Sequence, residues 1–193
     1  MNRIITISRE FGSGGRTVAM EAAKMLGIPC YDKELIEKTA EESGFAKEYI
    51  KERGEYAESG SWFSNALAAR DQYGRTNQDQ LFTVQSRIIT ELAEKESCVI
   101  IGRCADYILQ DKADLLKVFI YADMKSRAER IVRLYGEKED SPEKRLRDKD
   151  KRRAAYYSIY TDLKWGDMRN YDITLNSARV GIEHCAEIIA KLY

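Results

Sequence analysis

The sequence predicts an α/β fold in which a five-stranded parallel sheet is covered by helices on both faces. The main observation is that short apolar or β-branched runs alternate along the 193 residues with segments of helical periodicity. The run at 97–101 is continuously apolar after its first residue, as expected of a strand buried on both faces. The length fits a single domain.

The first strand and the first helix are joined by a glycine-rich turn. A β-branched run over 4–7 predicts the strand, and three glycines follow within four residues, at positions 12, 14 and 15. The next segment has apolar residues at helical spacing from Val18 to Leu26, and Gly27 is expected as its C-cap residue. A strand, a glycine-rich turn and a helix form the local architecture of a phosphate-binding loop.

The middle of the chain continues the alternation. A short strand is predicted over 28–32, followed by a helix over 33–43 that stops near Gly44. Residues 45–78 are polar and carry further glycines, so we expect helical pieces and loops there, an insertion outside the core. Helical spacing of apolar residues returns over 79–95.

The remaining strands are predicted at 97–101, 115–121 and 171–175. The first of them ends in Gly102-Arg103, and a helix is expected over about 104–110. Asp123 is a candidate N-cap residue for a helix after the second, and a closing helix follows the third.

The glycine-rich turn departs from the usual GxxxxGK[ST] pattern. If Gly12 and Gly14 take their usual places, the lysine position is Gly15; one residue later, Gly15-Arg16-Thr17 replaces Gly-Lys-Thr, but the first glycine becomes Glu10. In either reading a cation and a hydroxyl stand at the helix start, where a nucleotide phosphate and its Mg²⁺ need them. The alternative is a glycine-rich turn that binds nothing.

A second candidate feature is a cationic helix that begins at Ser141-Pro142, a good N-cap and first helical residue. Four of its cations fall at i, i+4, i+7 and i+8 and so share one face: Arg145, Lys149, Arg152 and Arg153. One interpretation is a solvated face whose cations pair with Asp148 and Asp150. Beside a phosphate loop, the pattern favours a lid that supplies arginines to a phosphoryl group.

Composition narrows the function classes. Lysine and arginine together number 32, as do aspartate and glutamate, so no net charge favours a nucleic-acid polymer or a membrane surface as partner. No apolar run approaches the roughly 20 residues of a spanning helix. The first residues enter a strand at once, so we expect a cytoplasmic protein. Four cysteines without CxxC pairing and a single histidine argue against zinc. A homodimer is the oligomer that base rates favour.

Four blocks of the sequence resemble the cytidylate kinase-like group of the P-loop nucleoside monophosphate kinases. They are residues 5–16 (ITISREFGSGGR), 28–35 (IPCYDKEL), 99–106 (VIIGRCAD), and the cationic helix followed by 165–172 (WGDMRNYD). The resemblance implies a P-loop NTPase-type core at 1–32, 79–136 and 170–193, an acceptor-binding region at 33–78 and a helical lid at 137–169. It also implies transfer of the γ-phosphoryl group of ATP to a nucleoside monophosphate, with cytidylate as the first guess, and a need for Mg²⁺.

The resemblance assigns roles to individual residues. The segment from Gly12 through Ser13, Gly14, Gly15 and Arg16 to Thr17 would hold the donor phosphates, with Arg16 replacing the absent lysine and Thr17 placed to meet Mg²⁺. The acceptor would be met by Arg103, by Asp32 and by Asp106, although Asp32 also suits the N-cap of the next helix and Asp106 a helix surface. The catalytic arginines of the lid would be Arg152 and Arg153.

Two departures from the family pattern leave alternatives open. The loop has no lysine, and the residue before Gly102, acidic in ordinary cytidylate kinases, is Ile101. Both favour a nucleotide-binding regulator or pseudokinase without turnover, whereas the retained arginines argue for catalysis. A small-metabolite kinase on the same fold is a further alternative. A phosphate acceptor should require Arg103, and an alcohol acceptor should not.

Overall fold

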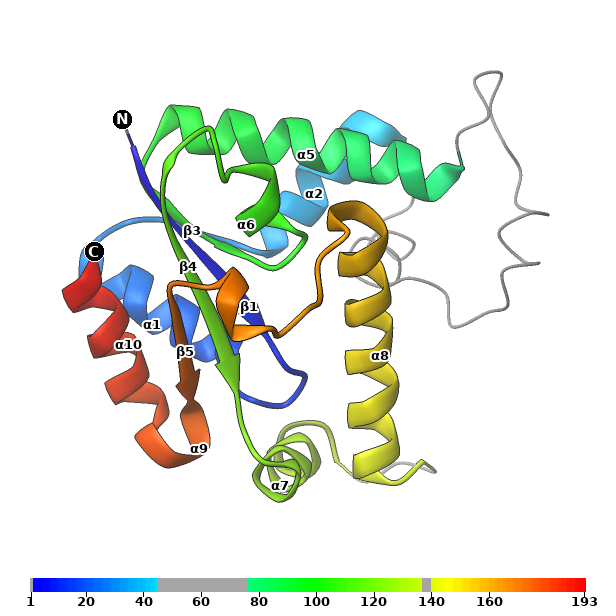
Figure 1. Ribbon diagram of the computed structural model, residues 1–193, viewed down its shortest axis with the longest axis vertical. Coiled ribbons are helices and arrows are strands. Elements are labelled where there is room, and N and C mark those ends of the chain that lie inside the picture. Colours follow the sequence, from blue (N-terminus) through cyan, green and yellow to red (C-terminus); the bar gives the residue numbers. More distant parts are fainter. Residues whose placement is uncertain (1, 45–75, 137–139) are drawn as a thin grey trace.

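The computed structural model of the chain describes residues 2–44, 76–136 and 140–193. Within these ranges one sheet of five parallel strands has the order β2-β3-β1-β4-β5 (Figure 1). The predicted fold class is confirmed. The strands are β1 (Arg3–Arg9), β2 (Cys30–Tyr31), β3 (Cys98–Ile101), β4 (Asp114–Tyr121) and β5 (Ile173–Asn176).

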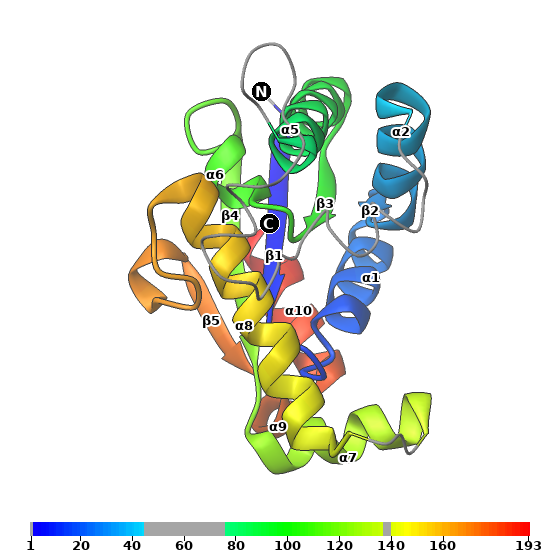
Figure 2. The ribbon, with the colours of Figure 1, turned by 90° about the vertical axis from the view of Figure 1, so that its right-hand side faces the viewer.

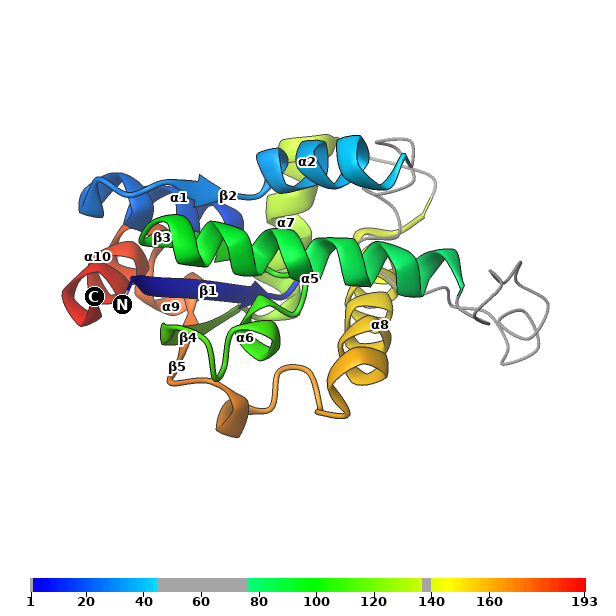
Figure 3. The ribbon, with the colours of Figure 1, turned by 90° about the horizontal axis from the view of Figure 1, so that it is seen from above.

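Helices cover both faces of this sheet. On one face lie α1 (Gly15–Leu26) and α10 (Ile182–Leu192), and on the other lie α5 (Asn77–Lys95) and α6 (Ala105–Ile108). Figure 3 shows α2 (Lys33–Ser43) beside α5, against which it packs. The other helices in the described ranges are α7 (Met124–Tyr135), α8 (Pro142–Thr161), the 3₁₀ helix η1 (Met168–Asn170) and α9 (Ser177–Val180).

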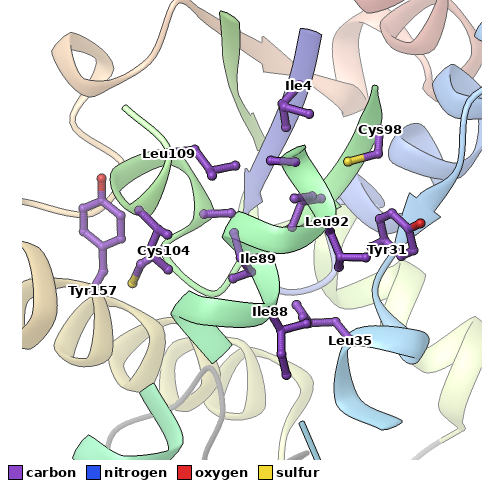
Figure 4. Packing of buried hydrophobic residues seen from close by; sticks show 14 of the residues in the cluster. Ile4, Tyr31, Leu35, Ile88, Ile89, Leu92, Cys98, Cys104, Leu109 and Tyr157 are labelled. Carbon is purple, nitrogen blue, oxygen red and sulfur yellow. The ribbon is translucent and has the colours of Figure 1, made fainter. Parts of the chain in front are cut away.

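The central strand β1 separates two hydrophobic clusters. Its alternation sends Ile4 to one face and Ile5 and Ile7 to the other, and all three are fully buried. The first cluster, shown in Figure 4, joins Ile4 to α5, α6 and the tyrosines of α8. The second joins the strand to α1 and α10. Because apolar residues pack against both faces, the carboxyl edge of the sheet is the place left for polar chemistry.

Several element boundaries differ from the prediction. The strand predicted over 28–32 is only the pair Cys30–Tyr31, and the helix predicted over 104–110 is α6, which begins later because Cys104 is left-handed. The closing helix is divided into α9 and α10 at Gly181, where φ is +88°. Most of the predicted insertion at 45–78 lies outside the described residues, as does 137–139 of the predicted lid. In the described ranges, no helix is long and apolar enough to cross a membrane.

The cationic helix is α8, and it runs from α7 past the carboxyl edge of the sheet toward α6 (Figures 1 and 2). Ser141 accepts a hydrogen bond from the Lys144 amide, which confirms the predicted N-cap. Its Asp150 does not pair along the helix surface, as one interpretation held. It accepts a hydrogen bond from the Phe11 amide at 2.7 Å and forms an ion pair with Arg127 of α7 at 2.5 Å.

This ion pair ties α7, α8 and the glycine-rich turn together. The side chains of Arg127 and Asp150 are only 6% and 17% exposed, and Arg127 also donates to the Phe11 carbonyl at 3.2 Å. Removing one member of such a pair leaves a buried charge without its main counter-charge, which is strongly destabilising.

We therefore expect Asp150→Ala to lower the free energy of unfolding by about 3 kcal/mol, as measured by urea denaturation. Asp148→Ala, an exposed neighbour on the same helix, serves as the control and should change it by less than about 0.5 kcal/mol. Equal effects of the two variants would show that the Arg127–Asp150 pair does not hold the two helices together.

Candidate functional site

The turn between β1 and α1 requires glycine, because of its backbone conformation and because other side chains lie close to it. Gly12 and Gly14 both have φ of +81°, a region that only glycine enters without strain. A Cβ atom built on Gly14 would lie 2.5 Å from Ile182 Cδ1 and 2.9 Å from Arg130 Cζ. The loop can therefore pass between α7 and α10 only because it lacks side chains here.

The same turn presents the start of a helix to solvent. The N-cap residue of α1 is Gly14, which has no side chain to cap the helix, and the Gly15 amide makes a long hydrogen bond of 3.4 Å to the Ser13 hydroxyl. The first-turn amides and the positive end of the helix dipole point toward this end, which suits an anion. The Ser13 hydroxyl, predicted to meet phosphate, donates instead to the Glu10 carbonyl at 2.9 Å, and Ser13 is buried. The Ser13 amide also donates to the Glu10 carbonyl at 3.3 Å, and the Ser13 carbonyl accepts from the Ser177 hydroxyl, so this residue shapes the loop.

A pocket of about 310 Å³ lies in front of the loop. Cationic side chains from four elements line it: Arg9 of β1, Arg16 of α1, Arg130 of α7 and Arg153 of α8. Thr17 accepts a hydrogen bond from Arg130 Nη2 at 3.1 Å. Arg130 was not predicted from the sequence, because nothing local distinguishes one arginine of α7 from its neighbours. A pocket with this charge can take a polyphosphate.

The structure brings together two residues that were predicted separately. Arg16 Nε lies 2.8 Å from Asp32 Oδ2, so the first turn of α1 is joined to the residue after β2. The side chain of Arg16 is 59% exposed and that of Asp32 is 21% exposed. An exposed pair of this kind contributes little to stability, at most about 1 kcal/mol.

A second pocket, of only about 10 Å³, adjoins the first. This arginine pocket shares Arg9 and Arg153 with the first pocket, the loop pocket, and it is also lined by Arg103. Its other lining residues are Ser8, Gly102, Cys104, Tyr156, Tyr157 and Trp165. Arg153 is buried and its Nη1 donates to the Arg9 carbonyl at 3.0 Å. Three arginines thus line one pocket at the carboxyl edge of the sheet.

Backbone strain marks this second pocket. Gly102, Arg103 and Cys104 are consecutive left-handed residues, with φ of +66°, +58° and +56°. A left-handed non-glycine residue costs on the order of 1–3 kcal/mol and persists where its surroundings over-determine it, often at functional sites. Arg103 is only 5% exposed. Arg103 is therefore a buried cation at the end of β3, on a strained stretch of backbone, and not a surface residue.

Asp106 is also buried, so its interpretation as a helix-surface residue is wrong. The carboxylate accepts a hydrogen bond from the Tyr157 hydroxyl at 2.8 Å. Burial raises the pKa of Asp106 above its usual range, because the charged form is poorly solvated there, and this outweighs the hydrogen bond from Tyr157. Burial likewise raises the pKa of Tyr157. The pair links α6 to α8 behind Arg103.

Arg152 is not brought to either pocket. It is exposed and lines a separate hollow of about 450 Å³, the outer hollow, together with Phe11 of the glycine-rich turn, Tyr135 of α7 and further residues of α8. The predicted cationic face of α8 is therefore divided: Arg153 points inward to the phosphate loop, whereas Arg145, Lys149 and Arg152 line the outer hollow. Helical spacing predicts that these four residues share one face of the helix. It does not predict which of them packs against the rest of the protein.

The donor atoms for a metal ion are few. Among the described residues, no three or more His, Cys, Asp or Glu side chains gather as a metal site. Mg²⁺ commonly binds through one or two protein oxygens and the phosphates of its nucleotide. The Thr17 hydroxyl, exposed at the loop pocket, fits that limited requirement.

The family model and the sequence relatives agree on one family. The family model described as the cytidylate kinase-like family matches residues 4–179. A cytidylate kinase of Archaeoglobus fulgidus is 32% identical and aligns over 97% of this chain and 92% of its own length. A cytidylate kinase of Methanosarcina mazei is 29% identical over 91% of this chain and 87% of its own.

Solved structures show the same fold. An uncharacterized protein from Eubacterium ventriosum is 30% identical, with a TM-score of 0.73, and the match covers 99% of this chain and 98% of that one. Shikimate kinase from Acinetobacter baumannii, with a TM-score of 0.56 and 17% identity over 100% and 92% of the two chains, shares the fold alone.

The buried carboxyl group gives a testable pH dependence. Ionised Asp106 costs folding free energy at any pH above its raised pKa, since the unfolded chain ionises the group more easily, and the cost vanishes below about pH 4, where both states are protonated. Asp106→Asn keeps an acceptor for Tyr157. It should therefore be more stable than the wild type at pH 8 in urea denaturation, with an advantage that shrinks as the pH falls.

The control is Asp111→Asn, an exposed residue after α6, which should stay within about 0.5 kcal/mol of the wild type at every pH. An Asp106→Asn variant that is less stable than the wild type at pH 8 would show that the charge itself stabilises the fold.

Proposed function

Because this chain belongs to the cytidylate kinase-like family, we propose that it transfers the γ-phosphoryl group of ATP to a nucleoside monophosphate, with cytidylate as the first acceptor to test. The family makes the chain a phosphotransferase of the kinase type. The observation that carries the proposal is the pair of adjoining pockets that share Arg9 and Arg153. Arginines that line both pockets suit the transfer of a phosphoryl group from one pocket to the other, since such transfer depends on positioning and charge neutralisation.

The donor side of the proposed site is the glycine-rich loop. The backbone from Gly12 to Thr17 would cradle the ATP phosphates, with Arg130 beside them. We assign the donor nucleoside to the hollow of about 360 Å³ that touches the loop at Gly12 and Ser13 and is lined by Ser126, Arg130, Arg133 and Ala178, among others. Arg130 lines both spaces, so it could contact the phosphates and the nucleoside together.

The acceptor side would be the arginine pocket, which at about 10 Å³ has to open before it can admit a phosphate group. Arg103 would meet the acceptor phosphate, and Asp106, held by Tyr157, would support the residues around it. Asp32, also predicted to meet the acceptor, is paired with Arg16 of the loop pocket. Arg153 reaches both pockets as it stands, so it is the stronger of the two predicted lid arginines. A role for Arg152 stays a prediction that needs α8 to move.

Mg²⁺ would lie between the loop and the phosphates. When bound there, it would neutralise part of the negative charge of the phosphates. In this chain the Thr17 hydroxyl is the candidate ligand, and in the structure it accepts a hydrogen bond from Arg130. The arginines then orient the phosphate oxygens and exclude water from the space between donor and acceptor.

The first experiment is ATP consumption with Mg²⁺ against a panel of nucleoside monophosphates, run beside an ATP-binding titration. We expect turnover with a pyrimidine nucleotide, because the named relatives are cytidylate kinases. Tight ATP binding without turnover on any member of the panel would contradict the proposal and favour the regulator or a kinase for another metabolite.

A second prediction concerns the chemistry of the acceptor. Arg103→Gly removes the guanidinium and suits the left-handed backbone at φ of +58°. If the acceptor carries a phosphate, the variant should lose on the order of 100-fold or more in kcat/KM for the acceptor, with Arg103→Lys recovering part of it. Steady-state kinetics with a varied acceptor measures this, and thermal unfolding checks that both variants fold.

Arg87→Ala provides the control, since Arg87 is an exposed residue of α5 that pairs with Glu42 and Glu91 away from both pockets. It should leave kcat/KM within about twofold. Unchanged acceptor kinetics in folded Arg103→Gly would contradict a phosphate acceptor and favour an alcohol acceptor.

A further inference from the structure

The structure shows an exchange of positions inside the phosphate loop. In the GxxxxGK pattern, a glycine begins the loop and a lysine ends it, six residues later. With Gly14 in its usual place, the first position of this chain is Arg9 and the lysine position is Gly15. The chain therefore has a cation where the pattern has glycine and a glycine where the pattern has the cation.

The two positions are in direct contact. Arg9 is the last residue of β1 and Gly15 is the first of α1. A Cβ atom built on Gly15 would lie 2.5 Å from Arg9 Cβ and 2.9 Å from Arg9 Cγ, with Ile120 Cβ next at 3.2 Å. Carbon atoms in contact prefer about 3.5–4.0 Å, so a side chain at position 15 and the Arg9 side chain compete for one volume. Each half of the exchange requires the other.

We propose that Arg9 is the cation of this phosphate loop, in place of the missing lysine. The proposal rests on the function proposed above, in which the loop holds the ATP phosphates. It replaces the earlier expectation that Arg16 takes the lysine's part. The root of the Arg9 side chain fills the space above the start of α1 from which a lysine side chain would have extended, so the charge enters the pocket from the strand and not from the helix.

The surroundings of Arg9 suit this role better than those of Arg16. Arg9 is half-buried, and its backbone is fixed in the sheet opposite Ile120 and by the Arg153 Nη1 hydrogen bond to its carbonyl. It lines both the loop pocket and the arginine pocket. Arg16, by contrast, is 59% exposed, and it lines only the loop pocket of the two.

The substitution of guanidinium for ammonium has a chemical consequence. A guanidinium is planar, always charged, and can donate two parallel hydrogen bonds to phosphate oxygens. From its place between the pockets, Arg9 would contact the donor phosphates on the side that faces the acceptor. It is therefore assigned as a direct contact to the transferring end of ATP.

The test is to reverse the exchange in the full-length protein. Three variants are compared with the wild type: Arg9→Gly, Gly15→Lys, and the double variant that carries both. ATP affinity is measured by calorimetric titration with Mg²⁺, turnover by the acceptor panel, and folding by thermal unfolding. Arg3→Ala is the matched control, because Arg3 is the arginine at the other end of β1, paired with Asp114 and with the last backbone carbonyls of α10 and the C-terminus.

We expect Arg9→Gly to raise the Kd for ATP by about 10- to 100-fold and to lower kcat by about 100-fold or more. Gly15→Lys alone should unfold at a lower temperature, because the new side chain collides with Arg9. The double variant should unfold at a higher temperature than Gly15→Lys and recover at least about tenfold of the ATP affinity that Arg9→Gly loses. Arg3→Ala should bind ATP within about twofold of the wild type. A merely structural role for Arg9 does not predict rescue by a lysine at another position of the backbone.

Two results would overturn the proposal: folded Arg9→Gly with unchanged ATP affinity, or a folded double variant that binds ATP no better than Arg9→Gly. ATP binding by the wild type without turnover on any acceptor would overturn the proposed function alone, since the order of ATP affinities across the variants still decides the role of Arg9. Absence of ATP binding by the wild type would overturn both.

Discussion

The close approach of backbone to side chains at the start of α1 is the constraint on which the candidate site depends. At Gly14 a Cβ atom would meet Ile182 and Arg130, and at Gly15 it would meet Arg9. Without side chains at these positions, the first turn of α1 lies open to solvent while three other elements close around it. The amides of the helix start and the surrounding cations then act on the same small volume, which is what an anion site requires.

The site also concentrates features that work against stability. Three arginines share a pocket, two successive non-glycine residues are left-handed, and burial raises the pKa of Asp106. A protein selected for stability alone would avoid each of them, and their coincidence at the carboxyl edge of a parallel sheet is typical of a functional site. The fold offsets these costs through packing on both faces of β1 and through the Arg127–Asp150 pair.

That pair gives α8 a double role. Asp150 binds the Phe11 amide and Arg127, so α8 is part of the scaffold of the loop, and Arg153, one turn further on, reaches the loop pocket. Family resemblance assigns this helix to a lid. In the structure its inner face is already seated against the loop, whereas Arg152 and its neighbours remain on the outer hollow. Movement of the outer residues would therefore have to leave the Asp150 contacts intact or break a buried ion pair.

The sequence by itself determined the parts of this protein that depend on local pattern. The alternation of strands and helices, the glycine turn, and the caps at Gly27, Asp123 and Ser141 were predicted and confirmed, because each is decided by residues close together in the chain. The tertiary structure decided which cations meet. Spacing along the chain favoured Arg16, beside the glycines, and left Arg9 and Arg130 unnoticed. Only the packing of β1 against α1 sets the Arg9 side chain over Gly15, and only the position of α7 brings Arg130 to the loop, because contacts between elements depend on strand order and helix orientation, which no local pattern encodes.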